Sequence, residues 1–228
     1  MHKNKYKKAI NACLSNANNL LADGKMLYEM DRLSSAYLLV LLAQEEIAKA
    51  FLLNLVDERI IPWIKEVEKS LTDHKCKHLI GELMFYLNPS LDTVIERGRI
   101  ALTNFQPAPL PKYIADIINY YRHEKIGRWI SPNWWWDEEP KYDKNIEKIA
   151  KGKFEKEKQD AIYCKVTKEG QFHLSKIRKK RVEEQINRAE QMLEIADGKI
   201  VLAFREYESI KKGFKIVFQT LFENKKND

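Results

Sequence analysis

Cysteine, glycine and proline are all scarce in this sequence. Among its 228 residues there are 3 cysteines, 8 glycines and 7 prolines. The cysteines, Cys13, Cys76 and Cys164, are odd in number and far apart, so they form neither a disulfide framework nor the Cys-x-x-Cys pair of a zinc site. We therefore expect a protein of a reducing compartment, with enough apolar residues for a core that needs no covalent cross-links.

Long apolar runs are missing too. A membrane-spanning helix needs about 20 consecutive, mainly apolar residues. The most apolar stretch, residues 36–56, is interrupted by Gln44, Glu45, Glu46, Lys49 and Asn54. The basic N-terminus lacks the apolar segment of a signal peptide. We expect a cytoplasmic protein that does not engage a membrane.

The charge balance is positive. A formal net charge of +7 favours an anionic partner, either RNA or an acidic protein. A modest positive excess is also common in proteins that bind neither, so the charge alone does not decide between them.

Apolar residues recur at three- and four-residue spacing along most of the chain, which predicts an all-α fold. The helices expected in the first half cover residues 5–22, 31–56, 63–70, 74–87, 90–102 and 112–125. The first should end near Asp23-Gly24, the second should be the central helix, and prolines should halt helical structure at 106–111.

We divide the chain into a helical bundle core, residues 1–142, and charged C-terminal helices, residues 143–228. The charged residues 143–160 are expected to form a solvated helix. Beyond residue 175 the pattern is again helical, with Gly198 and Gly213 as bends. These C-terminal helices should pack on the core or extend from it as a long hairpin or arm.

Charged residues interrupt the apolar stripe of the expected second helix. Glu45 and Lys49 are four residues apart with the acid first, a spacing that suits an ion pair, while Glu46 lies about 100° round the helix. Their apolar neighbours predict that this turn is buried, and a buried charge is costly unless it is paired and hydrogen-bonded. Partners for these charges must therefore come from elsewhere in the chain.

Two later segments supply candidate partners, namely Asp73-His74-Lys75 with Lys77 and His78, and Arg122-His123-Glu124-Lys125. Glutamate, histidine and several cations brought together would bind a phosphate backbone and move a proton, as metal-independent RNA cleavage requires. The same residues would serve equally as a structural polar network that fixes the register of the helices. Both interpretations remain open.

These residues belong to a pattern that resembles the AbiV family of phage abortive-infection proteins, whose domain is a divergent HEPN helical bundle. The resemblance rests on residues 9–21, on residues 35–50 with Glu45-Glu46-Ile47-Ala48-Lys49, on His74-Lys75-Cys76-Lys77, and on a segment ending at Trp129-Ile130-Ser131-Pro132. Together these segments lie between residues 9 and 132.

The resemblance implies an HEPN-like bundle that acts as a toxin-like antiphage effector, arresting growth or protein synthesis and held inactive until a phage product appears. HEPN relatives commonly dimerise and cleave RNA at the dimer interface, so it also implies a homodimer that acts on RNA or the translation machinery. The alternative is a non-catalytic helical protein that blocks a host or phage partner by binding.

One departure from the HEPN pattern concerns catalysis. Active HEPN ribonucleases usually carry arginine, four to six residues, and then histidine, and no arginine here stands at that spacing before a histidine. The nearest pairs are Lys69 with His74 and Lys168 with His173, and lysine lacks the forked guanidinium that grips phosphate at two points. The residues we predict for catalysis are His74 as acid or base, with Glu45, Glu46, Lys49 and Arg122. The residues we predict to bind RNA are Lys75, Lys77, His123 and Arg128.

A tryptophan-rich segment, Trp134-Trp135-Trp136, would suit stacking of unpaired bases beside Arg128. The acidic residues Asp137, Glu138 and Glu139 would repel phosphates, however, and favour packing or a protein interface.

A basic run, residues 176–181, would contact RNA electrostatically or simply begin a solvated helix, since Glu183 and Glu184 follow one turn on. The sequence has no Glu-x-x-His repeat of the kind found in di-iron bundles. We expect neither a metal ion nor another cofactor.

Overall fold

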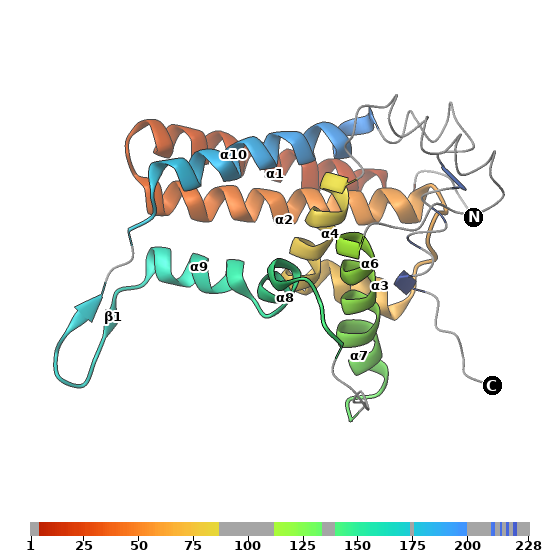
Figure 1. Ribbon diagram of the computed structural model, residues 1–228. Coiled ribbons are helices and arrows are strands. Elements are labelled where there is room, and N and C mark those ends of the chain that lie inside the picture. Colours follow the sequence, from red (N-terminus) through yellow and green to blue (C-terminus); the bar gives the residue numbers. More distant parts are fainter. Residues whose placement is uncertain are drawn as a thin grey trace.

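The protein is a helical bundle built around one long central helix, as a computed structural model shows (Figure 1). The residues that the structure describes are 5–86, 112–133, 140–173, 176–199, 211, 212, 215, 218, 221 and 222. The predicted helix at 90–102, the proline-spaced loop at 106–111, the segment Trp134-Trp135-Trp136 and Gly213 lie outside the described residues.

Helices dominate the described chain, which confirms the predicted all-α class. In chain order they are α1 (Lys7–Glu29), α2 (Leu33–Asp57), α3 (Lys65–Thr72), α4 (His74–Tyr86), α6 (Lys112–Asn119), the π-helical segment η1 (Tyr120–Gly127), α7 (Arg128–Ile130), α8 (Lys144–Ala150), α9 (Lys153–Ile162), α10 (Lys179–Glu194) and the π-helical segment η2 (Ile195–Lys199). One short antiparallel hairpin, β1 (Lys165–Val166) with β2 (Phe172–His173), follows α9.

The first two helices form an antiparallel pair. The apolar face predicted for the first helix is buried, and it consists of Ile10, Leu14, Ala17 and Leu21. Asp31 turns the chain with a φ of 57°, a left-handed conformation that aspartate tolerates better than most residues. The amides of Asp31 and Arg32 donate to the carbonyl oxygens of Tyr28 and Leu27, which satisfies the end of α1.

Gly24 does not end the first helix, contrary to the sequence-based prediction. The helix continues to Glu29, and Gly24 is buried against α2. A Cβ atom at this position would lie 2.8 Å from Cγ2 of Val40, closer than van der Waals contact allows. The glycine is there because the two helices approach closely, a cause that the local sequence does not reveal.

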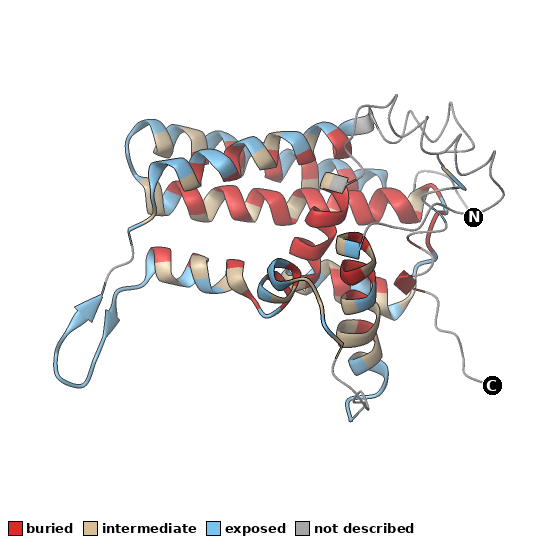
Figure 2. Ribbon diagram, in the orientation of Figure 1, coloured by how far each residue is buried: buried red, intermediate tan, exposed pale blue. Residues whose placement is uncertain are grey.

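The second helix is the centre of the core, as predicted. Helices α1 and α10 lie along one side of it, and α4 and α9 contact it from the other (Figure 1). Figure 2 shows buried residues along nearly its whole length. Burying a side chain such as Leu41, Phe51 or Leu55 contributes about 1.5–3 kcal/mol, so this helix contributes much of the hydrophobic stabilisation.

Residues 143–160 are not one solvated helix, so that prediction was wrong. The segment forms two helices, α8 and α9, separated at Gly152, whose φ of 99° is open to glycine and strained for other residues. Its buried residues are Ile146, Ile149, Ala150, Phe154, Lys158 and Ala161. These pack on α4 and α2, because apolar residues recur at helical spacing within the charged sequence.

Helix α10 packs along α1 and α2 and also contacts α4, where Met192 lies against Gly81. Its buried apolar residues are Val182, Ile186, Ala189 and Met192. Gly198, predicted as a bend, lies in the π-helical segment that continues α10. The division of the chain at residue 142 stays a prediction. No helix among the described residues has both the length and the apolarity needed to cross a membrane.

Candidate active site

A buried carboxylate lies where α2, α4 and α9 meet. It belongs to Glu45, which is only 2% exposed. Lys77 of α4 places Nζ 2.8 Å from Oε2 of Glu45, and Lys158 of α9 places Nζ 2.5 Å from Oε1. Both lysine side chains are themselves buried. The partners that the sequence required for this buried charge therefore come from two other helices.

Two histidines of α4 also reach this carboxylate. Nδ1 of His74 lies 2.5 Å from Oε2 of Glu45, and Nε2 of His78 lies 3.4 Å from Oε1. His74, Lys77 and His78 are three and four residues apart, so one face of α4 carries all three. We call Glu45, His74, Lys77, His78, Glu155 and Lys158 the Glu45 cluster.

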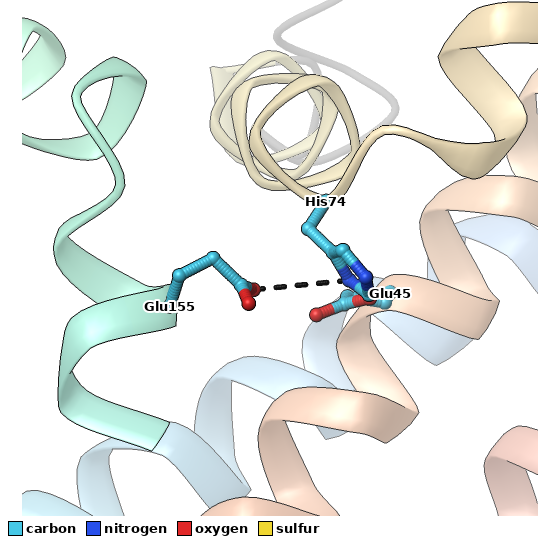
Figure 3. A group of neighbouring side chains, drawn as sticks. All are labelled: Glu45, His74 and Glu155. Carbon is cyan, nitrogen blue, oxygen red and sulfur yellow. Dashed lines mark hydrogen bonds and ion pairs between the residues drawn. The ribbon is translucent and has the colours of Figure 1, made fainter. Parts of the chain in front are cut away.

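Glu155 supplies a second carboxylate from the first turn of α9. Its Oε1 lies 3.7 Å from Nδ1 of His74 and 3.8 Å from Nε2 of His78, and it pairs with Lys158 one turn on. Figure 3 shows Glu155 extending from α9 towards His74 and Glu45. The two carboxylates of the cluster balance the charge of its two lysines.

Both carboxylates are ionised at neutral pH. Burial raises the pKa of Glu45, but its contacts with His78, Lys158 and Lys77 outweigh burial and hold that pKa well below its usual range. The contact with His78, followed by Lys158, lowers the pKa of Glu155 to about 2, against the smaller opposing effect of burial. The cluster is therefore held together by charge at physiological pH.

These lowered pKa values predict a loss of stability in acid. A carboxyl group whose pKa is lower in the folded than in the unfolded state stabilises the protein above its unfolded pKa, 4.5 for glutamate, and this contribution is lost as the pH falls through the folded pKa. Denaturant unfolding between pH 6 and pH 2 should show the free energy of unfolding falling below about pH 4.5. Glu155→Gln takes up as much as one proton fewer on unfolding. Its free energy of unfolding should therefore fall less steeply, by up to roughly 1.4 kcal/mol per pH unit. Parallel curves for the two proteins would contradict the assignment.

His74 is the member of the cluster that is open to solvent, with its side chain 49% exposed. Since Glu45 is ionised, Nδ1 of His74 donates to it, and in the neutral ring Nε2 is then the acceptor. A carboxylate that fixes the tautomer and orientation of an imidazole in this way prepares it to act as a general base. The arrangement provides one accessible group able to accept a proton.

The backbone around His74 is held in place by the residue before it. Asp73 accepts a hydrogen bond from the amide of Cys76 at 2.9 Å and forms an ion pair with Lys125 of η1 at 2.9 Å. Burial raises the pKa of Asp73, but Lys125 and the Cys76 amide lower it by more, so the net effect is a lowered pKa. Helix α4 therefore begins at His74 with its first turn capped by an ionised side chain.

The Glu45 cluster contains ligand types found in metal sites. Oxygen or nitrogen atoms of Glu45, His74 and Glu155 lie within 4.8 Å of one another. Lys77 and Lys158 already hold the same carboxylate oxygens, however, and their positive charges would repel a cation. This donor set does not fit a metal ion, and the expected absence of a metal stays a prediction.

The family model of the AbiV type of HEPN domain matches residues 5–194. The chain belongs to the AbiV family. AbiV membership implies a part in abortive infection, a form of antiphage defence, and it confirms the resemblance seen in the sequence. The match takes in α1 to α10 and hence every residue of the Glu45 cluster. No curated protein and no solved structure is significantly similar to the chain.

Three of the five residues predicted for catalysis in this AbiV chain lie outside the cluster, and two of them, Glu46 and Lys49, pair with each other. Lys49 pairs with Glu46 at 2.5 Å, so the ion pair predicted between Glu45 and Lys49 was wrong. The carboxylate of Glu46 contacts Cys13 of α1, which shows that this pair lies on the side of α2 that meets α1. Glu45 points the other way because the lysines of α4 and α9 hold it there.

Arg122 is also apart from the cluster. Among the residues that the structure describes, no hydrogen bond or ion pair links Arg122 to Glu45 or His74. Arg122 and His123 lie in η1, and Arg128 of α7 pairs with Glu124 at 2.8 Å. Lys69, the cation five positions before His74, lies over the ring of Trp129 at 5.4 Å.

The two lysines of α4 that were predicted to bind RNA occupy different environments. Lys77 is buried against Glu45, so its ammonium group does not reach the surface. Lys75 extends towards Gly152, where its Nζ lies 3.7 Å from the position that a Cβ atom would take.

Glu155 and Lys158 were missed among the candidate residues. A signal was present, since Phe154, Lys158 and Ala161 are spaced by four and three residues and share a helical face. A lysine on an otherwise apolar face requires a buried acid, and Glu45 was a buried acid for which partners were expected from elsewhere in the chain.

A second polar contact, near the start of α2, joins α2 and α9 to α10. The hydroxyl of Tyr37 donates to Glu157 of α9, and Arg181 of α10 donates to the same carboxylate at 3.1 Å. Glu157 is thereby paired towards the interior of the bundle.

Proposed function

We propose that this AbiV protein is a metal-independent endoribonuclease in which His74 is the general base. The observation that carries the proposal is the half-exposed imidazole of His74, oriented by the buried carboxylate of Glu45. Such a pair needs no metal ion to remove a proton from a hydroxyl group near neutral pH.

The chemistry would use the 2′-hydroxyl of the RNA itself. Nε2 of His74 takes the proton of that hydroxyl, and the 2′ oxygen forms a bond to the adjacent phosphorus. The bond from phosphorus to the 5′ oxygen breaks, and the leaving oxygen takes a proton from water. The products are a 2′,3′-cyclic phosphate and a 5′-hydroxyl end. Lys75, the residue after His74, would stabilise the negative charge that develops on phosphorus-bound oxygens.

The proposal includes a homodimer and a phage product that triggers activity, both of which rest on the family resemblance alone. The net charge of +7 supports an anionic substrate.

The test is to induce the protein in cells, with and without phage, and to map RNA ends and growth. Wild type should arrest growth and create new 5′-hydroxyl ends. His74→Ala should lower the rate at which these ends form by about 10²–10⁴-fold and should no longer arrest growth. His173→Ala is the matched control, because His173 lies on the exposed hairpin strand β2, away from the cluster. RNA ends that appear equally in wild type and His74→Ala would sink the proposal.

One observation favours a second candidate, an effector that acts by binding. The cross-strand pair Val166 and Phe172 is 70% and 76% exposed, which is unusual for apolar side chains facing each other across a hairpin. Growth arrest with intact RNA, unaffected by His74→Ala, would favour this function.

A further inference from the structure

A lysine-lined pocket lies at the turn between α8 and α9. It has a volume of about 440 Å³, and its lining residues are Lys148, Lys151, Gly152, Lys153, Lys156, Glu157 and Asp160. Four of these seven are lysines, so the pocket carries more positive than negative charge.

The acidic residues of the pocket are paired with other groups. Glu157 is held by Tyr37 and Arg181, and Asp160 pairs with Lys165. Lys151 pairs with Glu147. Lys148, Lys153 and Lys156, by contrast, make no ion pair with any residue that the structure describes. Nζ of Lys153 lies 5.8 Å from the centroid of the Phe154 ring, and the charge of Lys156 acts on Asp160. Neither contact is an ion pair, so the three ammonium groups are available to an anionic ligand.

The pocket adjoins Lys75, the residue after His74. Gly152 lines it, and Cε of Lys75 lies 3.1 Å from where a Cβ atom of Gly152 would be. A chain that leaves the pocket at Gly152 would thus meet Lys75, the residue after the exposed imidazole.

The lining also indicates which class of ligand fits. Protein interfaces concentrate aromatic residues at their centres and are depleted in lysine. The described residues that line this pocket include no apolar side chain, and most of them are lysines. This is the composition of a surface that contacts phosphates. An RNA backbone therefore fits better than an acidic protein.

We propose that Lys148, Lys153 and Lys156, with Lys75, hold the phosphate backbone of the RNA strand that enters the site at His74. This inference rests on the proposed function and adds to it the path of the substrate. Lys153 and Lys156 are three residues apart on α9, so their Cβ atoms lie about 5–6 Å apart and both can face one strand.

The test measures RNA binding apart from cleavage. A fluorescent single-stranded RNA of mixed sequence is titrated with the full chain carrying His74→Ala, over a series of salt concentrations. Adding Lys148→Gln, Lys153→Gln and Lys156→Gln should weaken binding roughly tenfold or more at low salt. It should also reduce the slope of log K against log salt by about 2, or about 0.7 for each phosphate that is no longer neutralised.

The matched control removes the same charge elsewhere. The control variant carries Lys5→Gln, Lys7→Gln and Lys8→Gln, at and just before the start of α1. In this region Tyr6 stacks on Trp63, beyond the C-terminal end of α2. This variant should bind RNA as the protein with His74→Ala alone does. Circular dichroism and the melting temperature should change little and equally in the two variants, since the substituted side chains form no ion pair within the part of the bundle that the structure describes and each variant removes one cation–π contact, Lys153 over Phe154 or Lys5 over Tyr6.

Three results would overturn the inference. They are unchanged affinity and salt slope in the pocket variant, an equal loss in the control variant, and displacement of the RNA by polyglutamate as effectively as by unlabelled RNA. If wild type cleaves RNA while the pocket variant still binds it normally, only the inference fails. If RNA binds at the pocket and wild type never cuts it, the proposed nuclease fails while the binding site stands.

Discussion

Replacing Glu45 with glutamine is expected to lower the free energy of unfolding by about 3–5 kcal/mol, the usual cost of removing one partner from a buried ion pair. Lys77 has its ion pair with Glu45, and both lysines that contact this carboxylate are buried. Glutamine has nearly the same shape but no charge, so it would leave an ammonium group without compensation in the interior. Urea unfolding followed by circular dichroism measures the difference.

The neighbouring glutamate provides the control. Glu46 has the same side chain on the same helix, but it and its partner Lys49 are both partly exposed. Glu46→Gln should therefore cost only about 0–1 kcal/mol, as exposed ion pairs usually do. Similar small losses in both variants would mean that the lysines around Glu45 reach water or find other partners, and that the cluster is not a closed electrostatic unit.

The helices could be predicted from the sequence where the hydrophobic period is uninterrupted. The central helix was expected at residues 31–56 and lies at Leu33–Asp57, because its apolar stripes leave no other secondary structure plausible. The end of α1 was misjudged at Gly24, because glycine there serves the close contact with Val40. A long-range contact of this kind leaves only an ambiguous local signal.

The site could be predicted in part. Glu45 stood out as a charge in an apolar stripe, and the structure brings His74 to it from α4. Glu155 and Lys158 were missed because the segment that carries them is so rich in charge that its narrow apolar face was overlooked. Lys158 is one of the two lysines that hold the carboxylate of Glu45, so missing it contributed to the wrong prediction that Glu45 pairs with Lys49.

The Glu45 cluster is an energetically costly way to hold three helices together. Replacing a buried ionic cluster with apolar residues of similar size is often neutral or stabilising. The stability of the bundle therefore gives little reason for charges at this position. A chemical task at His74 does give one, because the imidazole needs an ionised acceptor at Nδ1 and that acceptor needs cations around it.

This reasoning predicts that stability and activity can be separated. A variant with Glu45→Leu, Lys77→Met, Lys158→Met and Glu155→Gln is expected to unfold at the same free energy as wild type or up to about 4 kcal/mol higher, since both carboxylates and both lysines of the cluster lose their charge together. Under the proposed function it should also lose growth arrest and RNA cleavage, because His74 would keep its place on α4 but lose the carboxylate that orients it. Unfolding curves of the purified protein and growth after induction measure the two effects. A stable variant that still arrests growth as wild type does would show that the cluster is only architecture, and the function would then have to lie elsewhere on the chain.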